Sequence, residues 1–353
     1  MSKIKVCTID ISRYPEAVVN SIKDLPEIEI VPFANINKDA KAGTQKIIEQ
    51  KPDIIHLHWP ECHVNRSDDG DILVATYQEF FKKIKENNIK IIWTQHNIMP
   101  HNYRDSTYFK SIYELFAENS DGLIHHSEWG KKYFHETYKS NALDAVIRHG
   151  AFVDEIEYNG TKEEARDKLD IPQDKRIYLT LGGVRKDKNY EELIRCFSMR
   201  EEKNELLLFS LSHIGNDDYI NLIRKLAKPV KNIRLIEGLM SNEDLAINAR
   251  ASDTFIFAYG DKNLTSGSPH LSQAHGIPQI VLSSPYSEEI MGESGLFFEP
   301  TPTIGDGLNR FLDELDQQKL ETHQNFFHSI PEDYQWATIG KQTVNLYKEV
   351  LNK

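Results

Sequence analysis

The stretch LTLGGVRKDKNYEELIRCF, residues 179–197, contains the most informative local pattern in the chain. An apolar run ends at Gly182 and Gly183, the bases Arg185 and Lys188 follow, and a helical spacing of apolar residues then begins. Glycines permit a tight turn, and a helix N-terminus presents free N–H groups and the positive end of its dipole to anions. The stretch therefore predicts a strand-to-helix turn that holds phosphate groups, with an ordinary solvated turn as the alternative.

The same alternation of strand and helix patterns extends from this stretch in both directions. Helical patterns lie between successive strands, which is typical of mostly parallel α/β sheets that bind ligands at the carboxyl ends of their strands. Strands are expected at residues 3–11, 29–33, 53–59, 89–94, 122–126 and 145–148, and then at 177–181, 205–211, 233–237, 254–258 and 279–282.

The length of the chain indicates two domains. Its 353 residues exceed the size of one typical core, which is about 100–200 residues. The polar stretch AFVDEIEYNGTK at 151–162 separates the two strand series and is interpreted as a linker. We therefore expect two Rossmann-like domains, at residues 1–155 and 156–336, which face each other across a ligand-binding cleft.

Composition narrows the class of protein. The net charge of −12 argues against nucleic acid as a partner. No apolar run approaches the roughly 20 residues that span a bilayer, and MSKIKVCTID lacks the apolar core of a secretion signal, so a cytoplasmic protein is expected. Cys7, Cys62 and Cys196 have no paired spacing, which supports neither a disulfide framework nor a zinc site.

Lysines cluster in the first domain. Clusters of this kind could contact the anionic inner face of a membrane or could simply form solvated helix faces. They stand at positions 82, 83, 85, 90, 131 and 132.

Histidines follow several predicted strands of the first domain. His56 and His58 are two apart on one strand, His96 and Asn97 follow the next, and His149 ends the last. No carboxylate or thiolate stands beside them at metal-ligand spacing, so no metal is expected. Hydrogen bonds from single histidines to a polyhydroxy ligand fit this scatter better.

A second candidate anion site lies in the loop YGDKNLTSGSPHLSQAHG, residues 259–276. Hydroxyl and N–H groups converge there just before a predicted helix, and simple helix capping is the alternative. The residues concerned are Thr265, Ser266, Gly267 and Ser268, and Glu237, Tyr259 and Asn263 complete the expected substrate contacts of this domain.

Other motifs carry little weight. Asp69-Gly70-Asp71 has the form of a metal-binding DxD but stands directly before a predicted helix, where N-capping accounts for it. The sequence contains no GxSxG, no P-loop motif and no GxGxxG, so hydrolase, NTPase and simple dinucleotide-binding functions lack their signatures.

Six motifs together resemble the GT-B glycosyltransferases, most closely family 4 and the related bacterial enzymes that build surface polysaccharides. The resemblance covers nearly the whole chain and implies a nucleotide-sugar donor in the second domain, an acceptor in the first, and a last helix, 337–353, that returns to the first domain. The motifs are DIIHLHWPE at 53–61, IIWTQHNIMPHN at 91–102, HHSEWGKKYF at 125–134, VIRHG at 146–150, LGGVRKDKN at 181–189 and the 259–276 loop.

The resemblance also implies individual roles. Arg185 and Lys188 match the basic pair at the donor diphosphate, and Gly183 matches a close backbone approach to it. His96 matches the histidine that reaches the donor sugar. The matches for the phosphate loop are Ser266 and Gly267, and those for a motif at the cleft edge, where a helix cap is an equally good interpretation, are Ser127 and Glu128.

Two features depart from family 4. The pair of glutamates usually found eight residues apart in the loop and helix that here span 263–271 is missing, so no residue is assigned to the ribose. The first strand leads into ISRYPEAV rather than a glycine-rich loop, and Arg13 and Tyr14 are the candidates to replace it.

The expected activity is metal-independent and cofactor-free transfer of a hexosyl group from a UDP-, GDP- or dTDP-sugar to a hydroxyl of a glycan or lipid-linked saccharide. The resemblance favours retention of anomeric configuration. Within enzymes, the alternatives are a sugar-nucleotide epimerase or a phosphorylase. The missing glutamates leave open a non-catalytic nucleotide-binding relative that supports a partner transferase.

Overall fold

The computed structural model describes all of the chain except residues 1–2, 9–11, 35, 37–38, 64–68, 99, 101–106, 153–157, 213–216, 260–263, 293–294, 317–319 and 321–330. The chain forms two compact units, Met1–Gly150 with Pro331–Lys353, and Ala151–Ile330. The domain boundaries expected from the sequence were 155/156 and 336/337, a few residues later than the observed boundaries at 150/151 and 330/331. The second division falls earlier because the segment from Pro331 already belongs to the first unit, where Trp336 packs on Tyr14.

The first unit contains a six-stranded sheet in the order β2-β1-β3-β4-β5-β6, and every pair of neighbouring strands is parallel. Near-continuous apolar runs form the central strands, as expected for a parallel sheet that is covered on both faces. The strands are β1 (Ile4–Thr8), β2 (Ile28–Pro32), β3 (Ile54–Leu57), β4 (Lys90–Thr94), β5 (Gly122–His125) and β6 (Leu143–Val146).

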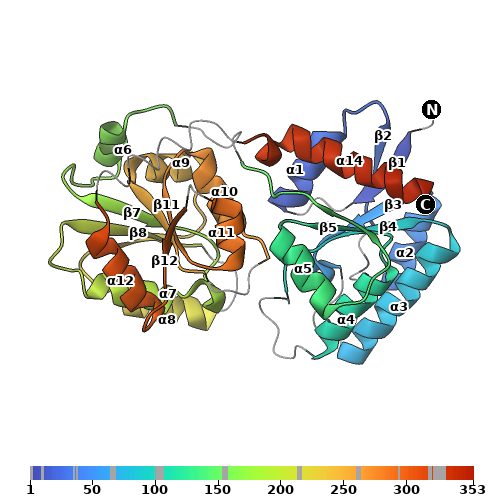
Figure 1. The fold of residues 1–353 in the computed structure, drawn as a ribbon, viewed down its shortest axis with the longest axis horizontal. Coiled ribbons are helices and arrows are strands. Elements are labelled where there is room, and N and C mark those ends of the chain that lie inside the picture. The colour runs from blue at the N-terminus through green and yellow to red at the C-terminus, as the bar shows by residue number, and fades with distance from the viewer. Residues whose placement is uncertain are drawn as a thin grey trace. The chain divides into compact units, whose positions relative to one another are not determined.

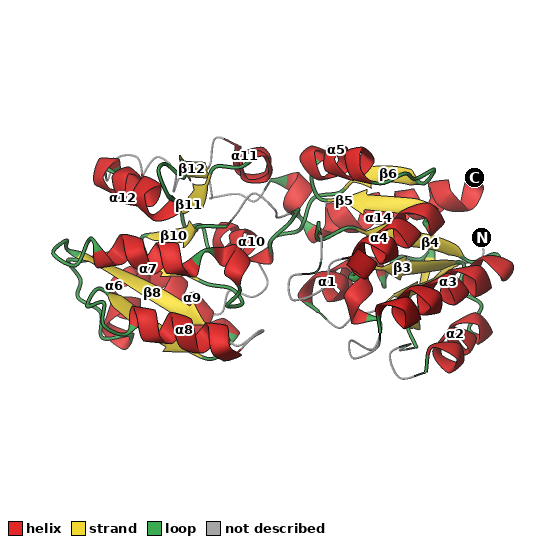
Figure 2. Ribbon diagram, turned by 90° about the horizontal axis from the view of Figure 1, so that it is seen from below, coloured by secondary structure: helices red, strands yellow, loops and turns green. Residues whose placement is uncertain are grey.

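Helices cover both faces of this sheet (Figure 2). Because side chains alternate along a strand, Ile91 and Trp93 of β4 pack in one core and Ile92 packs in the other. The last helix runs beside the first, on the same face of the sheet (Figure 1). The helices are α1 (Arg13–Ile22), α2 (Ala40–Glu49), α3 (Gly70–Glu86), α4 (Thr107–Asn119), α5 (Glu128–Thr137) and α14 (Trp336–Asn352), with 3-10 turns η1 (Pro60–Cys62) and η6 (Glu332–Tyr334).

The second unit repeats this plan with the order β12-β11-β10-β7-β8-β9, again wholly parallel. Its strands are β7 (Arg176–Thr180), β8 (Glu205–Leu211), β9 (Ile233–Glu237), β10 (Thr254–Phe257), β11 (Gln279–Leu282) and β12 (Gly295–Phe298). Its helices are α6 (Lys162–Lys168), the turn η3 (Lys186–Lys188), α7 (Tyr190–Ser198), α8 (Asp217–Ala227), α9 (Asn242–Ala251), α10 (Gly267–Ala274), α11 (Pro285–Met291) and α12 (Ile304–Glu314).

The structure differs from the sequence expectations in several places. Strand β3 ends at Leu57 rather than at residue 59, so His58 follows the strand. The last strand of the first unit spans Leu143–Val146 rather than 145–148, because its backbone pairs with β5 from Gly122 onward and leaves His149 in the following loop. The sequence analysis did not predict helix α6, which begins at the last residue of the expected linker and continues to Lys168. The signal was present as a capping box, in which Thr161 and Glu164 each satisfy a backbone N–H of the other.

Smaller expectations have clear outcomes. Cys7 and Cys196 are buried core residues, and none of the three cysteines forms a disulfide. Asp69 is the N-cap of α3, since its side chain accepts the N–H of Asp71. Across the part of the chain that the structure describes, we find no helix with the length and apolarity that crossing a membrane requires.

Candidate functional site

The glycines Gly182 and Gly183 follow β7 after one residue, Leu181, at the point where the strand order of the second unit reverses. The chain passes from β7 to β8 on one side and later returns to β10 on the other side. In doubly wound sheets, ligands bind outside the carboxyl ends of the strands at such a point. Gly182 has φ +120°, and a Cβ there would lie 3.0 Å from Oγ of Ser268. Glycine is therefore required both for the turn and for close approach of the chain at this position.

Lys188 is a buried cation at this strand end, with 3% of its surface exposed. Its Nζ lies 3.0 Å from the centroid of the Tyr259 ring and donates to Oγ of Ser266 at 3.3 Å. Among the described residues, no carboxylate forms an ion pair with it, and Asp187 next to it binds Arg185 instead. Burial, helped by the charge of Arg185, lowers the pKa of Lys188 well below its ordinary value. A buried cation without an anion is unfavourable, so the site is suited to a negatively charged ligand.

Arg185 is oriented by its neighbour rather than left free. Its Nε and Nη2 donate to the two carboxylate oxygens of Asp187 at 2.9 and 2.8 Å. Burial acts to lower the pKa of Arg185, but the Asp187 carboxylate outweighs it and the pKa is raised. The two predicted cations therefore differ: Lys188 lacks an anionic partner among the described residues, whereas Arg185 already has one.

The N-terminus of α10 lies beside Lys188. Ser266 stands at the N-cap position, but its side chain makes no capping hydrogen bond, and its backbone N–H donates to the Tyr286 hydroxyl at 3.2 Å. The same hydroxyl lies 3.4 Å from Oγ1 of Thr265. Simple N-capping by Ser266 is therefore wrong. A helix N-terminus without a capping side chain can receive an anion at its first-turn N–H groups, those of Gly267 and Ser268.

Two predicted contacts of the second unit do not join this group. Glu237 ends the edge strand β9, and both of its carboxylate oxygens bind Arg224, at 2.8 and 2.9 Å. Because both oxygens already bind Arg224 in this exposed ion pair, the Glu237 carboxylate needs no ligand as a partner. Asn263 lies outside the described residues. Tyr259 does belong to the group, since its ring covers Lys188 and its hydroxyl donates to the Leu181 carbonyl at 3.2 Å.

The first unit gathers buried histidines around the ring of Tyr14, where its own strand order reverses between β1 and β3. The ring centroids of His96, His126, His149 and His58 lie 4.8, 4.9, 5.0 and 5.7 Å from that of Tyr14. His96 is the centre of a chain, because its Nε2 is 3.1 Å from Nδ1 of His58 and its Nδ1 is 3.3 Å from Nε2 of His126. The structure therefore brings into contact histidines that the sequence analysis could assign only to separate strand ends.

Burial keeps these imidazoles uncharged. It lowers the pKa of His56 to about 3 and that of His126 to about 4, and it lowers the pKa values of His58 and His96 well below the ordinary value. Neighbouring histidines lower several of these values further. The cluster therefore offers neutral hydrogen-bonding groups at neutral pH, rather than positive charge.

Several polar atoms of this cluster lack a partner among the described residues, although they are buried. They include the Tyr14 hydroxyl and Nε2 of His58; both amide atoms of Gln95, just before His96 in the chain, also have none. Buried polar groups are nearly always hydrogen-bonded, and each exception requires an explanation. A polar ligand at this strand end would supply the missing partners.

The remaining predicted residues of the first unit have mixed outcomes. Asn97 is buried and donates to Oε1 of Glu61 at 3.4 Å, while Nδ1 of His149 lies 2.9 Å from the Gly150 carbonyl. Arg13 is exposed at the start of α1. Ser127 caps α5 by accepting the N–H of Gly130 at 2.9 Å, which confirms the capping interpretation.

Sequence reasoning missed three aromatic or imidazole residues of this cluster. His126 was quoted in a motif without a role, and its only signal was its place directly after a strand. Trp59 stacks on His96 with centroids 4.1 Å apart, and Trp336 lies 5.6 Å from Tyr14. No local pattern could identify Trp336, because its contact with Tyr14 joins the two ends of the chain.

The lysine clusters are largely explained by ion pairs within the unit. Lys83 pairs with Glu79 and Glu86, and Lys90 pairs with Asp121. Lys131 and Lys132 also have carboxylate partners. These contacts favour the solvated-face interpretation over a membrane-binding surface.

Comparisons with known proteins give structural matches only. No family model matches the chain, and no curated protein matches its sequence. A glycosyltransferase from Rickettsia africae aligns over 100% of both chains at 16% identity with a TM-score of 0.75. Anabaena HepE in complex with UDP and glucose aligns over 98% of this chain and 99% of its own, at 11% identity and a TM-score of 0.72. A structure described as a putative UDP-N-acetylglucosamine 2-epimerase from Listeria monocytogenes aligns over 99% and 97%, at 16% identity and a TM-score of 0.63.

These matches confirm the predicted fold. The chain has the two-domain, Rossmann-like architecture of the GT-B proteins, as its motifs indicated. Identities of this size establish the fold alone, and fold by itself does not decide function. Function must therefore be inferred from the two strand-end groups.

Proposed function

We propose that this protein is a glycosyltransferase that moves a sugar from a nucleoside diphosphate sugar to a hydroxyl of a saccharide acceptor. The observation that carries the proposal is Lys188, a buried cation without an anionic partner among the described residues, next to the uncapped N-terminus of α10. Both features favour a phosphate group, and both lie at the switch point of the second unit.

The donor diphosphate would occupy this group in the second unit. Gly182 and Gly183 allow the backbone to approach it, Lys188 neutralises its charge, and the first-turn N–H groups of α10 donate to it. An arriving phosphate also raises the pKa of Lys188 again, because an opposite charge favours the ammonium form. Since HepE of the same fold was solved with UDP and glucose, a uridine diphosphate sugar is the first donor to test.

The acceptor would bind at the histidine group of the first unit. Neutral imidazoles, the Tyr14 hydroxyl and the stacked pair of Trp59 and His96 suit a polyhydroxy ligand, since sugars combine hydrogen-bonding edges with apolar faces. The resemblance to family 4 leads us to infer a glycan or lipid-linked saccharide of a bacterial surface polysaccharide.

The chemical step loads negative charge onto the departing diphosphate while the sugar becomes oxocarbenium-like. Preorganised groups that meet this charge stabilise the transition state. Lys188 and the α10 N–H groups do so without a metal ion. We infer a retaining reaction, in which the departing phosphate itself takes the acceptor proton, on the resemblance to family 4. Retention would be contradicted if the anomeric coupling in the proton NMR spectrum of the product showed a β linkage from an α-linked donor.

The first experiment is a thermal-shift panel of UDP-, GDP- and dTDP-sugars, since a ligand that binds the folded state raises its stability. Transfer is then compared between Lys188→Gln and Lys186→Gln. Lys186 is an exposed base in the same turn and serves as the matched control. We expect Lys188→Gln to lose at least about 100-fold in turnover, by analogy with removal of one oxyanion donor. Near-normal turnover in Lys188→Gln, or an equal loss in Lys186→Gln, would contradict the site.

A second candidate function is a sugar-nucleotide epimerase, and the structural similarity to the Listeria protein supports testing it. Conversion of the donor sugar in the absence of acceptor separates the two activities. A third outcome, nucleotide binding with no release of sugar under any condition, would identify a non-catalytic relative, as the missing glutamate pair allows.

A further inference from the structure

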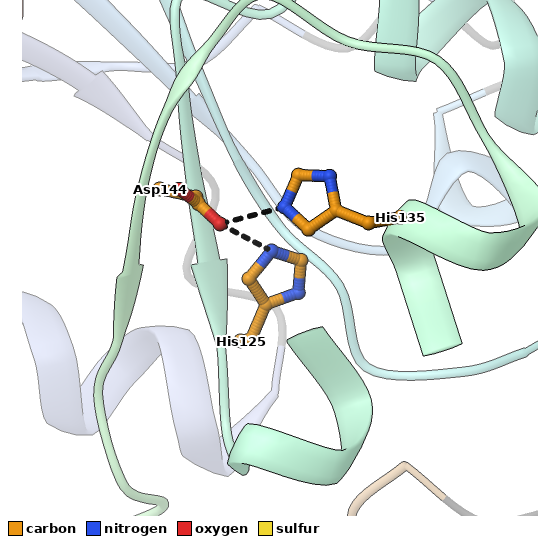
Figure 3. A group of neighbouring side chains, drawn as sticks. All are labelled: His125, His135 and Asp144. Carbon is orange, nitrogen blue, oxygen red and sulfur yellow. Dashed lines mark hydrogen bonds and ion pairs between the residues drawn. The ribbon is translucent and has the colours of Figure 1, made fainter. Parts of the chain in front are cut away.

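A second polar cluster of the first unit lies away from the Tyr14 group and has no place in the proposed transfer. His125 ends β5, His135 lies near the end of α5, and Asp144 lies in β6. Figure 3 shows both imidazole rings pointing at the carboxylate of Asp144. His125 and His126 are adjacent in sequence, but their side chains serve different groups, because His125 packs on Phe134 and His126 packs on Tyr14.

The distances within this cluster are those of a site that could close on an ion. Nε2 of His135 is 2.8 Å and Nε2 of His125 is 3.9 Å from Oδ2 of Asp144. One ligand atom from each of the three residues lies within 4.8 Å of the others. Ligands in a tetrahedral zinc site stand about 3.3 Å apart, given bond lengths of about 2.0–2.2 Å. Small rotations of the side chains would therefore give three ligands, with a fourth position open to water.

His125 supplies an independent reason to expect a ligand. Its exposed fraction is 1%, and neither ring nitrogen has a hydrogen-bond partner among the described residues. A buried polar group without a partner is unfavourable. Nε2 nevertheless faces a carboxylate and a second imidazole, so an ion at this point would give it a partner.

Lys131 is the competing feature. Its Nζ lies 3.3 Å from the same Oδ2 of Asp144, where it supplies a positive charge in the absence of any ion. The Lys131 side chain is 34% exposed, so it can turn outward to solvent and release the carboxylate. An ion that binds here must displace this ammonium group.

We propose that His125, His135 and Asp144 bind a divalent transition metal, with zinc as the first ion to test. Two imidazoles and one carboxylate are typical zinc ligands, whereas Mg²⁺ prefers an octahedral shell of oxygen atoms. The ion would join β5, α5 and β6 on the side of β5 opposite to His126. Because these three residues belong to the first unit and take no part in the donor site proposed for the second unit, the proposal is independent of whether the chain transfers sugars.

The test is calorimetric titration of the full chain, after treatment with a chelator, with Zn²⁺ and separately with Mg²⁺. We expect one zinc ion per chain, no saturable Mg²⁺ binding at this site, and an absorption spectrum of tetrahedral type when Co²⁺ is used in place of zinc. Asp144→Asn and His135→Gln should each weaken zinc binding at least about tenfold. Lys131→Gln should tighten zinc binding several-fold, because the competing ammonium group is gone.

Lys132→Gln is the matched control, because Lys132 is a neighbouring base that pairs with Glu136 rather than with Asp144. It should leave zinc affinity unchanged. His125→Gln removes a buried side chain, so its folding must first be checked by circular dichroism, and His135→Gln carries the test if it unfolds. The proposal is overturned if Lys131→Gln fails to bind zinc, or if Asp144→Asn binds zinc as tightly as the unaltered chain.

Discussion

The ammonium group of Lys188 lies 3.0 Å from the centroid of the Tyr259 ring. The two residues follow neighbouring strands, β7 and β10, and together form a cation–π pair. The ring face is the negative part of the aromatic quadrupole and attracts the cation. The contact fixes where the charge stands before any ligand arrives. It supplies no full negative charge, which leaves the cation able to bind a phosphate tightly.

The ring, rather than the hydroxyl, of Tyr259 should hold Lys188 in place. Tyr259→Phe keeps the ring and loses the hydroxyl, which donates to the Leu181 carbonyl and also contacts Ser266 and Ser268, so we expect donor affinity within about threefold of normal. Tyr259→Leu removes the ring and should weaken donor binding about tenfold, in line with a partly desolvated cation–π contact of about 1–2 kcal/mol. Calorimetric titration with the donor found in the thermal-shift panel provides the measurement. Equal losses in both variants would assign the effect to the hydroxyl.

Gly182→Ala should impair both stability and donor binding. Its φ of +120° is strained for a side chain, and the new Cβ would stand 3.0 Å from Oγ of Ser268. We expect a loss of about 1–3 kcal/mol in the free energy of unfolding. Gly238 is the control, because its φ of +84° is also positive but a Cβ there would meet nothing within 4 Å. Gly238→Ala should reduce stability and leave donor binding intact, as urea unfolding and titration can show.

Much of the fold follows from local patterns, because a parallel sheet covered on both faces requires apolar strands that stand out in the sequence. The turn after β7 was also predictable, since two glycines between a strand and a helix have few other uses. The partnership of Arg185 with Asp187 was not foreseen, although their spacing in the sequence suggests it. The burial of Lys188 was not predictable at all, because Tyr259 covers it from a loop that follows a different strand.

The histidine cluster illustrates the same limit. Each histidine could be assigned to a strand end, and parallel strands bring such ends together, so a common location was predictable. Tyr14 was named only as a candidate to replace the glycine-rich loop, and its place at the centre of the histidines was not foreseen, because its helix begins in a segment that departs from the family pattern. Trp336 completes the group from the last helix, a contact that depends wholly on the tertiary fold.

The buried histidines should make the protein sensitive to acid. The folded-state pKa of His56 is lowered to about 3 from an unfolded value near 6.5, so the unfolded state binds more protons below pH 6.5. Stability is therefore fully present above that pH and falls as the pH drops, by about 1.4 kcal/mol per pH unit for each such histidine. Urea unfolding at pH 7, 6 and 5 measures the slope. His56→Gln should flatten it by one residue's share, and an unchanged slope would contradict the assignment.

Ser127 should contribute to stability and not to chemistry. Its side chain accepts the N–H of Gly130 at the start of α5, and loss of an N-cap costs about 1 kcal/mol. We expect Ser127→Ala to lower the free energy of unfolding by about that amount, with turnover and donor affinity unchanged. Thermal unfolding and a transfer assay on the same preparation check both parts. A large loss of turnover in a stable Ser127→Ala variant would instead support a substrate role.

Tyr14→Phe separates a ligand-binding hydroxyl from a packing role. The Tyr14 hydroxyl is buried and has no partner among the described residues, so its removal should leave the protein as stable as before or more stable. If the hydroxyl contacts the acceptor, the variant should raise the acceptor KM about tenfold and leave donor affinity unchanged, because a lost hydrogen bond to a ligand is worth about 0.5–1.5 kcal/mol. Steady-state transfer kinetics with acceptor varied provides the measurement. An unchanged KM with raised stability would show that the histidine cluster binds no acceptor through Tyr14.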